Sequence, residues 1–485
     1  MSLDMIHDVL SWTTLLPILV LIVSFNFLWH KKCSNREKKK LPPGDMKFPL
    51  IGETMEFFNA QRRNQLFEEF VRPRVLKHGK IFKTRIMGSP TVIVNGSEAN
   101  RFFLTNEFKL VKSSWPSSSV QLMGTDSIME TDGERHRFLR GLIGTSLGYA
   151  GLEILVPKLC NHVRFFLESK WEGEGNTISL YRSTKMLTFS IVFECLLGIK
   201  VEQGMLETFE KVLEGVFSPA IEFPGTKFWR AKKARMEIEK ALRKEVREKR
   251  KEMEENLHSN EKEDGMLLSR LVNAMIKGEI SEKEVIDNVV LLVFAAHDTT
   301  SFAIAMTFKM LAQHPDCYSK LLQEHIDITK NKERDENLSM EDIKKMKYTW
   351  QVARESMRLF PPIFGSFRKA ITDIEYEGYT IPQGWKVLWT TYGTHYNEEY
   401  FKEAQSFKPS RFEEEEMPQY AFVPFGGGPR MCAGYQLAKI NILILVHYVV
   451  TKYDWFLLHP QEPITMDPLP FPSLGMPIRF FPKQN

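Results

Sequence analysis

The hydrophobic pattern of the chain begins with one long run near the N-terminus. Residues 9–29 contain no charged side chain and are rich in leucine, isoleucine and valine. About 20 apolar residues are enough to cross a bilayer as a helix, so this run predicts a transmembrane anchor. Six basic residues and one acidic residue follow within residues 31–40, which by the positive-inside rule places the rest of the chain on the cytosolic side. A cleaved signal peptide is the competing interpretation, although its basic residues should precede the apolar run.

The four residues Leu41-Pro42-Pro43-Gly44 stop any helix and predict a stiff turn. No later stretch rich in proline, glycine and serine indicates a second domain boundary. The expected organisation is a short N-terminal tail (1–8), the anchor (9–29), a basic stop-transfer segment with a proline-rich hinge (30–44) and one large domain (45–485).

Alternating and β-branched residues predict few strands in the large domain. Residues 80–94 predict two short strands around Gly88-Ser89-Pro90. Further strands are expected at residues 374–381, 386–391 and 478–481. Residues 113–133 are rich in Ser, Pro, Gly and Asp and predict a long loop with one helical turn. Helical periodicity dominates elsewhere, as over residues 152–275, so the expected fold class is mainly α with small β-sheets.

The longest predicted helix begins with a capping box and is apolar on nearly every side. Ser281 and Glu284 form the box, and the chain then runs to Gln313 without Gly or Pro. The apolar middle, residues 289–305, predicts a helix buried in the core. Asp298 lies inside that run, where a carboxylate is costly unless it is paired or hydrated. It belongs either to a buried polar network between helices or to a functional site.

Charge is concentrated in a second helix, over residues 230–255, which is densely covered with Lys, Arg and Glu. Such a segment is usually a solvated helix face; contact with lipid headgroups or a redox partner is the alternative. The apolar residues 216–225 before it predict a loop able to dip into a membrane and admit an apolar substrate. A net charge of +4 over 485 residues is too small to argue for a nucleic-acid partner.

The pattern of cysteines favours a role in ligand binding or catalysis over disulfide crosslinks. Five widely spaced cysteines without a Cys-x-x-Cys pair argue against a disulfide framework or a zinc site. Cys432 lies in Phe-Gly-Gly-Gly-Pro-Arg-Met-Cys-Ala-Gly, residues 425–434. The glycines allow this loop to lie flat against something bulky and planar. Because helical periodicity starts at Ala433, the sulfur precedes a helix N-terminus, which favours a thiolate and hence a metal ligand.

Two plainer interpretations of this loop are a phosphate-binding turn and a small buried cysteine. The first needs a following Lys-Ser or Lys-Thr, which is not there. The second is common for an isolated cysteine. Arg430, two residues before the cysteine, could reach an anionic group on whatever the loop covers and would favour a charged sulfur.

The loop as a whole resembles the haem-binding signature of the cytochrome P-450 family, the haem-thiolate monooxygenases. Phe425, Gly428, Arg430, Cys432 and Gly434 stand at the signature positions, and the resemblance implies that Cys432 is the axial ligand of haem iron. Residues 295–299, Ala-Ala-His-Asp-Thr, are similar to the oxygen-binding motif of the family, with Ala296 where glycine is common. The resemblance implies that Thr299 holds oxygen and its waters, that Asp298 relays protons, and that Ala295 lines the site.

The same resemblance assigns further residues by position. It implies that Arg140 and Arg368 bind the haem propionates, with His136 in the place of the usual tryptophan. Glu355, Arg358 and Arg411 match a network that fixes the fold behind the haem. The segments that line the substrate pocket in the family contain Val120, Leu122, Met123, Ile363, Phe364, Leu469 and Phe471.

The implied activity is hydroxylation or oxidation of a hydrophobic polycyclic substrate with O2. The implied cofactor is haem b, with electrons from NADPH passed on by NADPH-cytochrome P450 reductase, and the implied location is the endoplasmic reticulum membrane, with one span and the large domain in the cytosol. Residues 347–355, 367–373 and 379–386 are similar to plant oxidases of triterpenoids, taxane-type diterpenoids and, more distantly, steroid hormones. A reductase-independent lipid isomerase or dehydratase and a non-enzymatic membrane-bound haem sensor remain as alternatives.

Overall fold

The computed structural model describes residues 39–48, 51–171, 176–255, 265–333, 336–414 and 416–483, together with Ser24. The predicted anchor therefore lies outside the described residues, apart from Ser24. Among the described residues, helix α13 (Glu282–Gln313) is long and apolar enough to cross a membrane, but 72% of its apolar stretch is buried in the protein. It is a core helix, as its sequence predicts. The bent pair Gly133–Leu147 and Tyr149–Trp171 passes the same test only if it is counted as one span.

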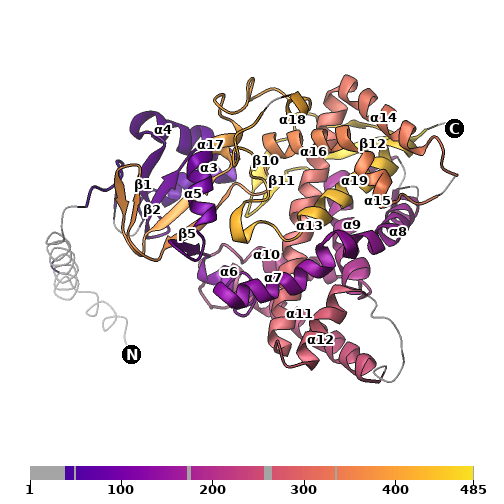
Figure 1. Cartoon of the computed structure of the whole chain (residues 1–485), viewed down its shortest axis with the longest axis horizontal. Helices are drawn as coiled ribbons and strands as arrows, with labels where there is room; N and C mark the ends of the chain where they lie inside the picture. Colours follow the sequence, from indigo (N-terminus) through magenta and orange to yellow (C-terminus); the bar gives the residue numbers. More distant parts are fainter. Residues whose placement is uncertain are drawn as a thin grey trace, which may run out of the picture.

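A five-stranded sheet and the helices around it form one side of the molecule, and the larger remainder is helical (Figure 1). The strand order is β1-β2-β8-β5-β3, with β2 and β8 parallel and the other pairs antiparallel. These strands are β1 (Ile81–Ile86), β2 (Ser89–Val94), β3 (Val111–Ser113), β5 (Gly365–Ala370) and β8 (Lys386–Thr390). Met87 and Gly88 both have positive φ, the backbone that a tight two-residue hairpin turn requires, and the predicted hairpin is confirmed.

Three smaller sheets complete the strand content. They consist of β4 (Thr177–Ser179), β12 (Pro477–Pro482) and β9 (Tyr453–Leu457); of β10 (Ile464–Met466) and β11 (Pro470–Pro472); and of β6 (Ile374–Tyr376) and β7 (Tyr379–Ile381). The predicted strand over residues 374–381 is wrong in one respect, because Glu377 and Gly378 have positive φ and divide it into a hairpin.

The helices form most of the part of the chain that the structure describes. Those before the long core helix are α3 (Thr54–Arg62), η1 (Leu66–Val71), α4 (Arg72–His78), α5 (Ser97–Thr105), α6 (Ser117–Met123), α7 (Gly133–Leu147), α8 (Tyr149–Phe166), η2 (Leu167–Trp171), α9 (Leu180–Ser190), η3 (Ile191–Leu197), α10 (Met205–Leu213), α11 (Lys227–Glu255) and α12 (Leu267–Ile276). Those after it are α14 (Pro315–Thr329), α15 (Met340–Lys345), α16 (Lys347–Leu359), α17 (Tyr392–His395), α18 (Arg411–Glu414), η5 (Gly428–Arg430) and α19 (Tyr435–Lys452).

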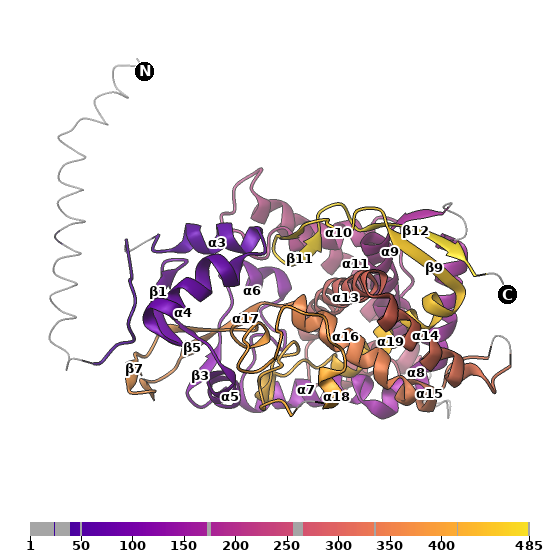
Figure 2. The same ribbon diagram turned by 90° about the horizontal axis from the view of Figure 1, so that it is seen from above.

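Helix α13 is the centre of the main core. The Ser281 and Glu284 capping box forms as predicted. The helix packs against α9, α16 and α19, and Figure 2 shows it surrounded by helices. Since α13 and α19 bury apolar side chains on nearly every side, the two helices that carry the predicted oxygen-binding and cysteine motifs are held rigidly by the same core.

Residues 113–133 form more helix than their composition predicts. Helix α6 has seven residues instead of one turn. The hydroxyl groups of Ser118 and Ser119 donate to the Val216 carbonyl oxygen at 2.8 and 2.6 Å, and Leu122 is buried. The extra helix is therefore stabilised by contacts with a distant segment, which local composition does not encode.

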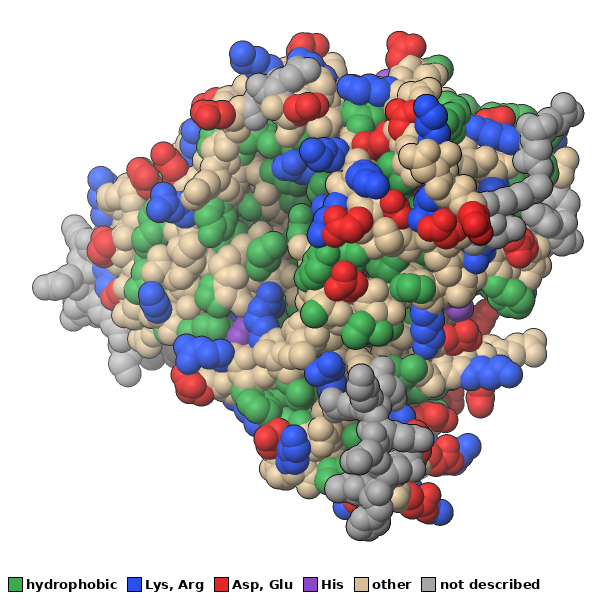
Figure 3. All heavy atoms as spheres, turned by 45° about the vertical axis from the view of Figure 1, so that its right-hand side comes forward, with side chains coloured by type: hydrophobic (Ala, Val, Ile, Leu, Met, Phe, Trp, Pro, Cys, Tyr) green, Lys and Arg blue, Asp and Glu red, His purple; other side chains and the backbone are tan. Residues whose placement is uncertain are grey.

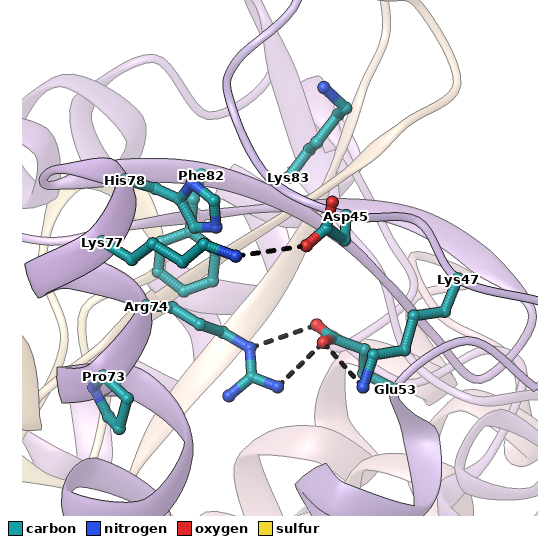
Figure 4. Close-up of a pocket in the computed structure, with 9 residues that line it drawn as sticks. All are labelled: Asp45, Lys47, Glu53, Pro73, Arg74, Lys77, His78, Phe82 and Lys83. Carbon is teal, nitrogen blue, oxygen red and sulfur yellow. Dashed lines mark hydrogen bonds and ion pairs between the residues drawn. The ribbon is translucent and has the colours of Figure 1, made fainter.

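The proline-rich hinge is attached to the body along its length. The backbone N–H of Lys83 donates to the Pro43 carbonyl at 2.7 Å, and that of Thr380 donates to the Lys40 carbonyl at 2.8 Å. Lys77 pairs with Asp45, and Lys47 and Arg74 both pair with Glu53 around a hollow of about 270 Å³ (Figure 4). A side chain on Gly44 would lie 2.3 Å from the Lys83 carbonyl oxygen, so only glycine fits at this contact.

Candidate functional site

The cysteine loop, residues 425–434, is held in a fixed shape by its own backbone. The Cys432 N–H donates to the Phe425 carbonyl at 2.9 Å, and the ring of Phe425 packs edge-on against Tyr435 with centroids 4.8 Å apart. A side chain on Gly434 would come within 3.8 Å of the Cys432 sulfur. This is an ordinary van der Waals distance, so the contact with the sulfur does not by itself require glycine at this position.

The thiol of Cys432 is accessible, yet it is enclosed by surrounding protein. Its side chain is exposed, but burial raises the pKa of the thiol, while the Gly434 N–H and the Arg140 guanidinium lower it by smaller amounts. The net shift is upward, opposite to the expectation from a helix N-terminus, because desolvation outweighs the nearby donors. A metal cation held by Cys432 would favour the thiolate over the thiol and would offset this upward shift.

Gly428 differs from Gly434 in this respect. Its φ is +65°, and a side chain on it would lie 1.9 Å from the carbonyl oxygen of Leu104. Leu104 lies near the C-terminal end of α5, which packs against the η5 turn of the cysteine loop. The structure therefore assigns Gly428 to close packing of the loop on α5, a contact that any other residue would block.

The predicted oxygen-binding motif divides between two sides of α13. Ala295 is exposed in the middle of an otherwise buried helix, and Thr299, one turn later, is partly exposed. The Thr299 hydroxyl donates to the Ala295 carbonyl at 2.7 Å. Asp298 is 2% exposed and points to another side, since consecutive helical residues lie about 100° apart. Among the described residues no hydrogen bond joins the Asp298 and Thr299 side chains.

Asp298 is held by partners that its local sequence does not reveal. Lys185 on α9 pairs with Asp298 at 2.8 Å and with Glu210 on α10 at 2.9 Å. His297 Nε2 lies 3.2 Å from the other carboxylate oxygen of Asp298. Burial lowers the pKa of Lys185, but the two carboxylates more than offset this and raise it above its usual value. A chain of charged groups therefore leads from buried Asp298 to Glu210, whose side chain is 32% exposed.

Helix α7 presents two polar side chains with few protein partners. His136 is buried, and its pKa is lowered to about 4 by burial and by the charges of Arg430 and Arg140. Its ring packs against Phe108 with centroids 5.1 Å apart. Within the described part of the chain, neither His136 nor Arg140 has a side-chain hydrogen bond or ion pair. Both can therefore donate to a bound group.

Arg368 and Arg430 meet on one carboxylate that sequence analysis missed. Arg368 Nε lies 2.6 Å from one oxygen of Glu107, and Arg430 Nε lies 2.7 Å from the other. Glu107 is fully buried. Arg430 also donates to the carbonyls of Ile128, Met129 and Thr131 at 3.2, 3.1 and 2.5 Å, so it ties the cysteine loop to the segment before α7.

Glu355, Arg358 and Arg411 come together as the resemblance implies. Arg358 forms two parallel hydrogen bonds of 2.8 Å with the Glu355 carboxylate, and Arg411 Nε lies 3.0 Å from it. All three side chains are fully buried. Their remaining guanidinium donors bond to the backbone carbonyls of residues His395, Lys402, Glu403, Ala404 and Ser406. This network fixes the chain between α16 and the cysteine loop.

The predicted substrate-pocket residues are apolar side chains of several elements. Leu122 and Met123 are buried in the main core, while Val120, Ile363, Phe364, Leu469 and Phe471 are partly exposed. The hollows of about 270 and 420 Å³ are lined by other residues. On the face drawn in Figure 3, hydrophobic side chains gather around a hollowed middle, and acidic and basic side chains surround it. Which of these side chains contact substrate stays a prediction.

The donor set fits an anionic iron macrocycle. Cys432 supplies a soft ligand for iron. Arg140 and His136 supply donors that the described protein residues leave unused, and Arg140 lies close enough to Cys432 for each to shift the pKa of the other. Ala295 exposes a small apolar surface on α13, where a flat ring can lie. These observations support haem as the group that the residues would hold.

Comparisons with known proteins agree with this geometry. Residues 42–480 match the family model described as Cytochrome P450. The chain is 39% identical to a taxane 13-alpha-hydroxylase of Taxus cuspidata over 91% of this chain and 92% of the relative. It is 40% identical to a taxoid 2-alpha-hydroxylase of Taxus canadensis (92% and 90%) and 35% identical to a beta-amyrin 28-monooxygenase of Barbarea vulgaris (95% and 97%). A solved structure of retinoic acid bound cyanobacterial CYP120A1 superposes with a TM-score of 0.82 at 28% identity, covering 92% of this chain and 100% of that chain.

Proposed function

This chain belongs to the cytochrome P450 family, and from that premise we propose that it hydroxylates a hydrophobic polycyclic terpenoid or sterol-like substrate. It is an oxidoreductase, a monooxygenase that uses haem b, O2 and electrons derived from NADPH. The observation that carries the proposal is the accessible Cys432 thiol beside Arg140, at the start of the core helix α19.

Each residue of the site has a defined part in this proposal. Cys432 would hold the iron of haem, and Arg140, His136 and Arg368 would hold its carboxylates. When bound, haem supplies the activation of O2 that no amino-acid side chain can perform. The protein fixes the position of the cofactor: the backbone hydrogen bond from Cys432 to Phe425 and the close packing of Gly428 on α5 leave the loop little freedom.

Asp298 and Thr299 on α13 are assigned to proton delivery. Glu210 is partly exposed, Lys185 lies between it and Asp298, and both contacts are shorter than 3 Å. A rotation of the Asp298 side chain away from Lys185 would bring a proton toward the exposed side of α13, where Thr299 lies. We expect Asp298→Asn to lower turnover by roughly 100-fold while haem content stays unchanged. An unchanged turnover would remove Asp298 from the relay.

The substrate class is inferred from similarity together with the apolar residues assigned to the pocket. The relatives act on taxanes and beta-amyrin, and the similar solved structure holds retinoic acid. The residues assigned to contact substrate, among them Ile363, Phe364 and Phe471, are apolar and partly exposed. Hydrophobic burial therefore supplies most of the binding free energy, and few polar groups fix the orientation of the substrate.

Residues 9–29 are proposed as a single span in the endoplasmic reticulum membrane, with the large domain (45–485) in the cytosol. The run of apolar residues followed by basic ones supports this orientation. Electrons would then come from NADPH-cytochrome P450 reductase in the same membrane. Full-length chain in microsomes should resist extraction at high salt, and removal of residues 1–29 should release most of it.

The decisive experiment is the optical spectrum of the reduced carbon monoxide complex of purified full-length protein. Thiolate ligation gives a red-shifted band, which Cys432→Ser should abolish. Cys160→Ser, at a buried free cysteine elsewhere in the core, serves as the matched control and should keep the band. Wild-type protein without this band would contradict the proposal. Product formation from taxane and triterpenoid substrates that depends on both NADPH and reductase would then separate a monooxygenase from a reductase-independent isomerase.

A further inference from the structure

Glu107 stands out as a buried carboxylate with no part in the residues assigned so far. It lies between α5 and β3, its side chain is fully buried, and it accepts a hydrogen bond of 2.8 Å from the Ser113 N–H. A buried carboxylate is costly unless it is paired. Its two oxygens lie 2.7 and 2.6 Å from Arg430 and Arg368, so one negative charge is shared between two guanidinium groups.

Three distant segments converge at this carboxylate. The pairing of β3 with β5 places Arg368 opposite Ser113. The close packing of Gly428 on Leu104 brings the cysteine loop to the C-terminal end of α5. Glu107 lies two residues after this end, directly before a turn. Phe108, with a positive φ of 68°, begins that turn, and the guanidinium of Arg430 lies over its ring at 4.9 Å. The backbone therefore directs both arginines to one point.

The net charge of this cluster indicates which kind of ligand it would bind. Arg140, Arg368 and Arg430 bring three positive charges near the cysteine loop and Glu107 brings one negative charge, while the nearby Lys112 and Glu130 offset each other, which leaves a balance of +2. Two carboxylates are what haem b carries. The Arg430 charge also disfavours the charged form of Arg368, so the two guanidinium groups repel each other when nothing lies between them.

Resting on the function proposed above, we propose that Glu107 is a positioning residue: it holds Arg368 in the geometry that grips a haem carboxylate, and it keeps Arg430, whose other donors bind backbone carbonyls, from moving away from Arg368. It touches neither substrate nor iron, and it acts through the arginines. Supporting partners of cofactor ligands commonly change affinity by 10–100-fold when removed.

The test is the rate at which purified holoenzyme loses haem to an excess of apomyoglobin. We expect Glu107→Gln to lose haem at least about 10-fold faster than wild type and to have a more positive reduction potential, because a negative charge near the iron is gone. Glu53→Gln is the matched control, since Glu53 is also buried and pairs with an arginine, Arg74, at 2.8 Å but far from the cysteine loop. It should change neither quantity.

Glu107→Asp is a second test variant, which keeps the inference testable if Glu107→Gln does not fold. It keeps the charge and shortens the side chain, so we expect an intermediate rate of haem loss with an unchanged reduction potential. Wild-type rates in both Glu107 variants, or equal changes in Glu107→Gln and Glu53→Gln, would overturn the inference. Wild-type protein that carries no thiolate-bound haem would instead contradict the function proposed for the chain, and the two failures are thereby separated.

Discussion

Two buried clusters in this molecule have the same composition, one glutamate between two arginines, but different surroundings. Around Glu355, every side chain is fully buried and the free donors of Arg358 and Arg411 end on backbone carbonyls. Around Glu107, Arg368 and Arg430 remain 5% and 12% exposed, and Arg140 and His136 nearby have unused donors. The remaining donors of Arg430 also end on backbone carbonyls, so the clusters differ in exposure and in neighbours: the Glu355 cluster is closed to solvent, and the Glu107 cluster is partly open to it. Under the function proposed above, the same residue types would serve stability in one place and cofactor binding in the other.

The largest expected difference between the clusters is in stability. Glu355→Gln leaves two buried guanidinium groups without a counter-charge, and breaking such a buried pair costs about 3–5 kcal/mol. Glu107→Gln should cost less, because the guanidinium groups of its cluster keep some contact with solvent. Urea unfolding of both variants, followed by circular dichroism, measures the difference. If Glu107→Gln proves the more destabilised of the two, the distinction between closed and open clusters fails.

A histidine lies beside each cluster, and the two histidines should change the pH dependence of the unfolding free energy in different ways. This effect is smaller than the first. His395, beside Arg358, has its pKa lowered to about 3 by burial and by that arginine. Because this pKa lies below the ordinary value of 6.5, the unfolded chain takes up the proton first as the pH falls. The stabilising contribution of neutral His395 is therefore complete above pH 6.5 and decreases on acidification, by about 2 kcal/mol between pH 6.5 and pH 5.

His395→Gln tests this contribution, since a glutamine oxygen can still accept the hydrogen bond that the Val423 N–H donates to His395 Nε2 at 3.1 Å. The slope of unfolding free energy against pH should become shallower by that amount, and the exposed His459→Gln should leave it unchanged. His136, beside the open cluster, should behave differently: a bound anionic group raises its pKa, so its contribution should depend on haem. Equal slopes in His395→Gln and wild type would contradict the assignment.

The smallest expected effect comes from a pair with the same chemistry on the surface. Glu134 and Arg137 on α7 form an ion pair with side chains 86% and 77% exposed. Exposed pairs contribute roughly 0–1 kcal/mol, so Glu134→Gln should change the unfolding free energy by less than about 0.5 kcal/mol. The same urea titration measures it. A loss comparable to that of Glu355→Gln would mean that burial is not what separates these pairs.

The sequence predicts the fold best where the pattern is long and periodic. The capping box and apolar length of α13 and the β1–β2 hairpin are confirmed. The hairpin at residues 374–381 and the full length of α6 are missed, because a turn at Glu377 and contacts with Val216 decide them. Local pattern does not contain contacts made by segments far apart in the chain.

The same limit applies to the candidate site. Cys432, Arg140 and the Glu355 network follow from short motifs, whereas Glu107 and Lys185 lie in segments without any recognisable motif. Each is found only when the fold brings it to a partner more than 100 residues away, Arg430 in one case and Asp298 in the other. A buried charged side chain such as Asp298 or Arg368 needs a partner of opposite charge. Nothing in the sequence says which residue that partner is.

The attachment of the proline-rich segment has a practical consequence for shortened versions of the protein. Lys40 and Pro43 accept backbone hydrogen bonds from β7 and β1, and Gly44 is fitted against Lys83. A soluble form for crystallisation should therefore start no later than residue 39. A chain that starts at residue 45 would lack these contacts and would expose the edge of β1, the outer strand of the five-stranded sheet. An exposed strand edge promotes pairing with another copy of the protein.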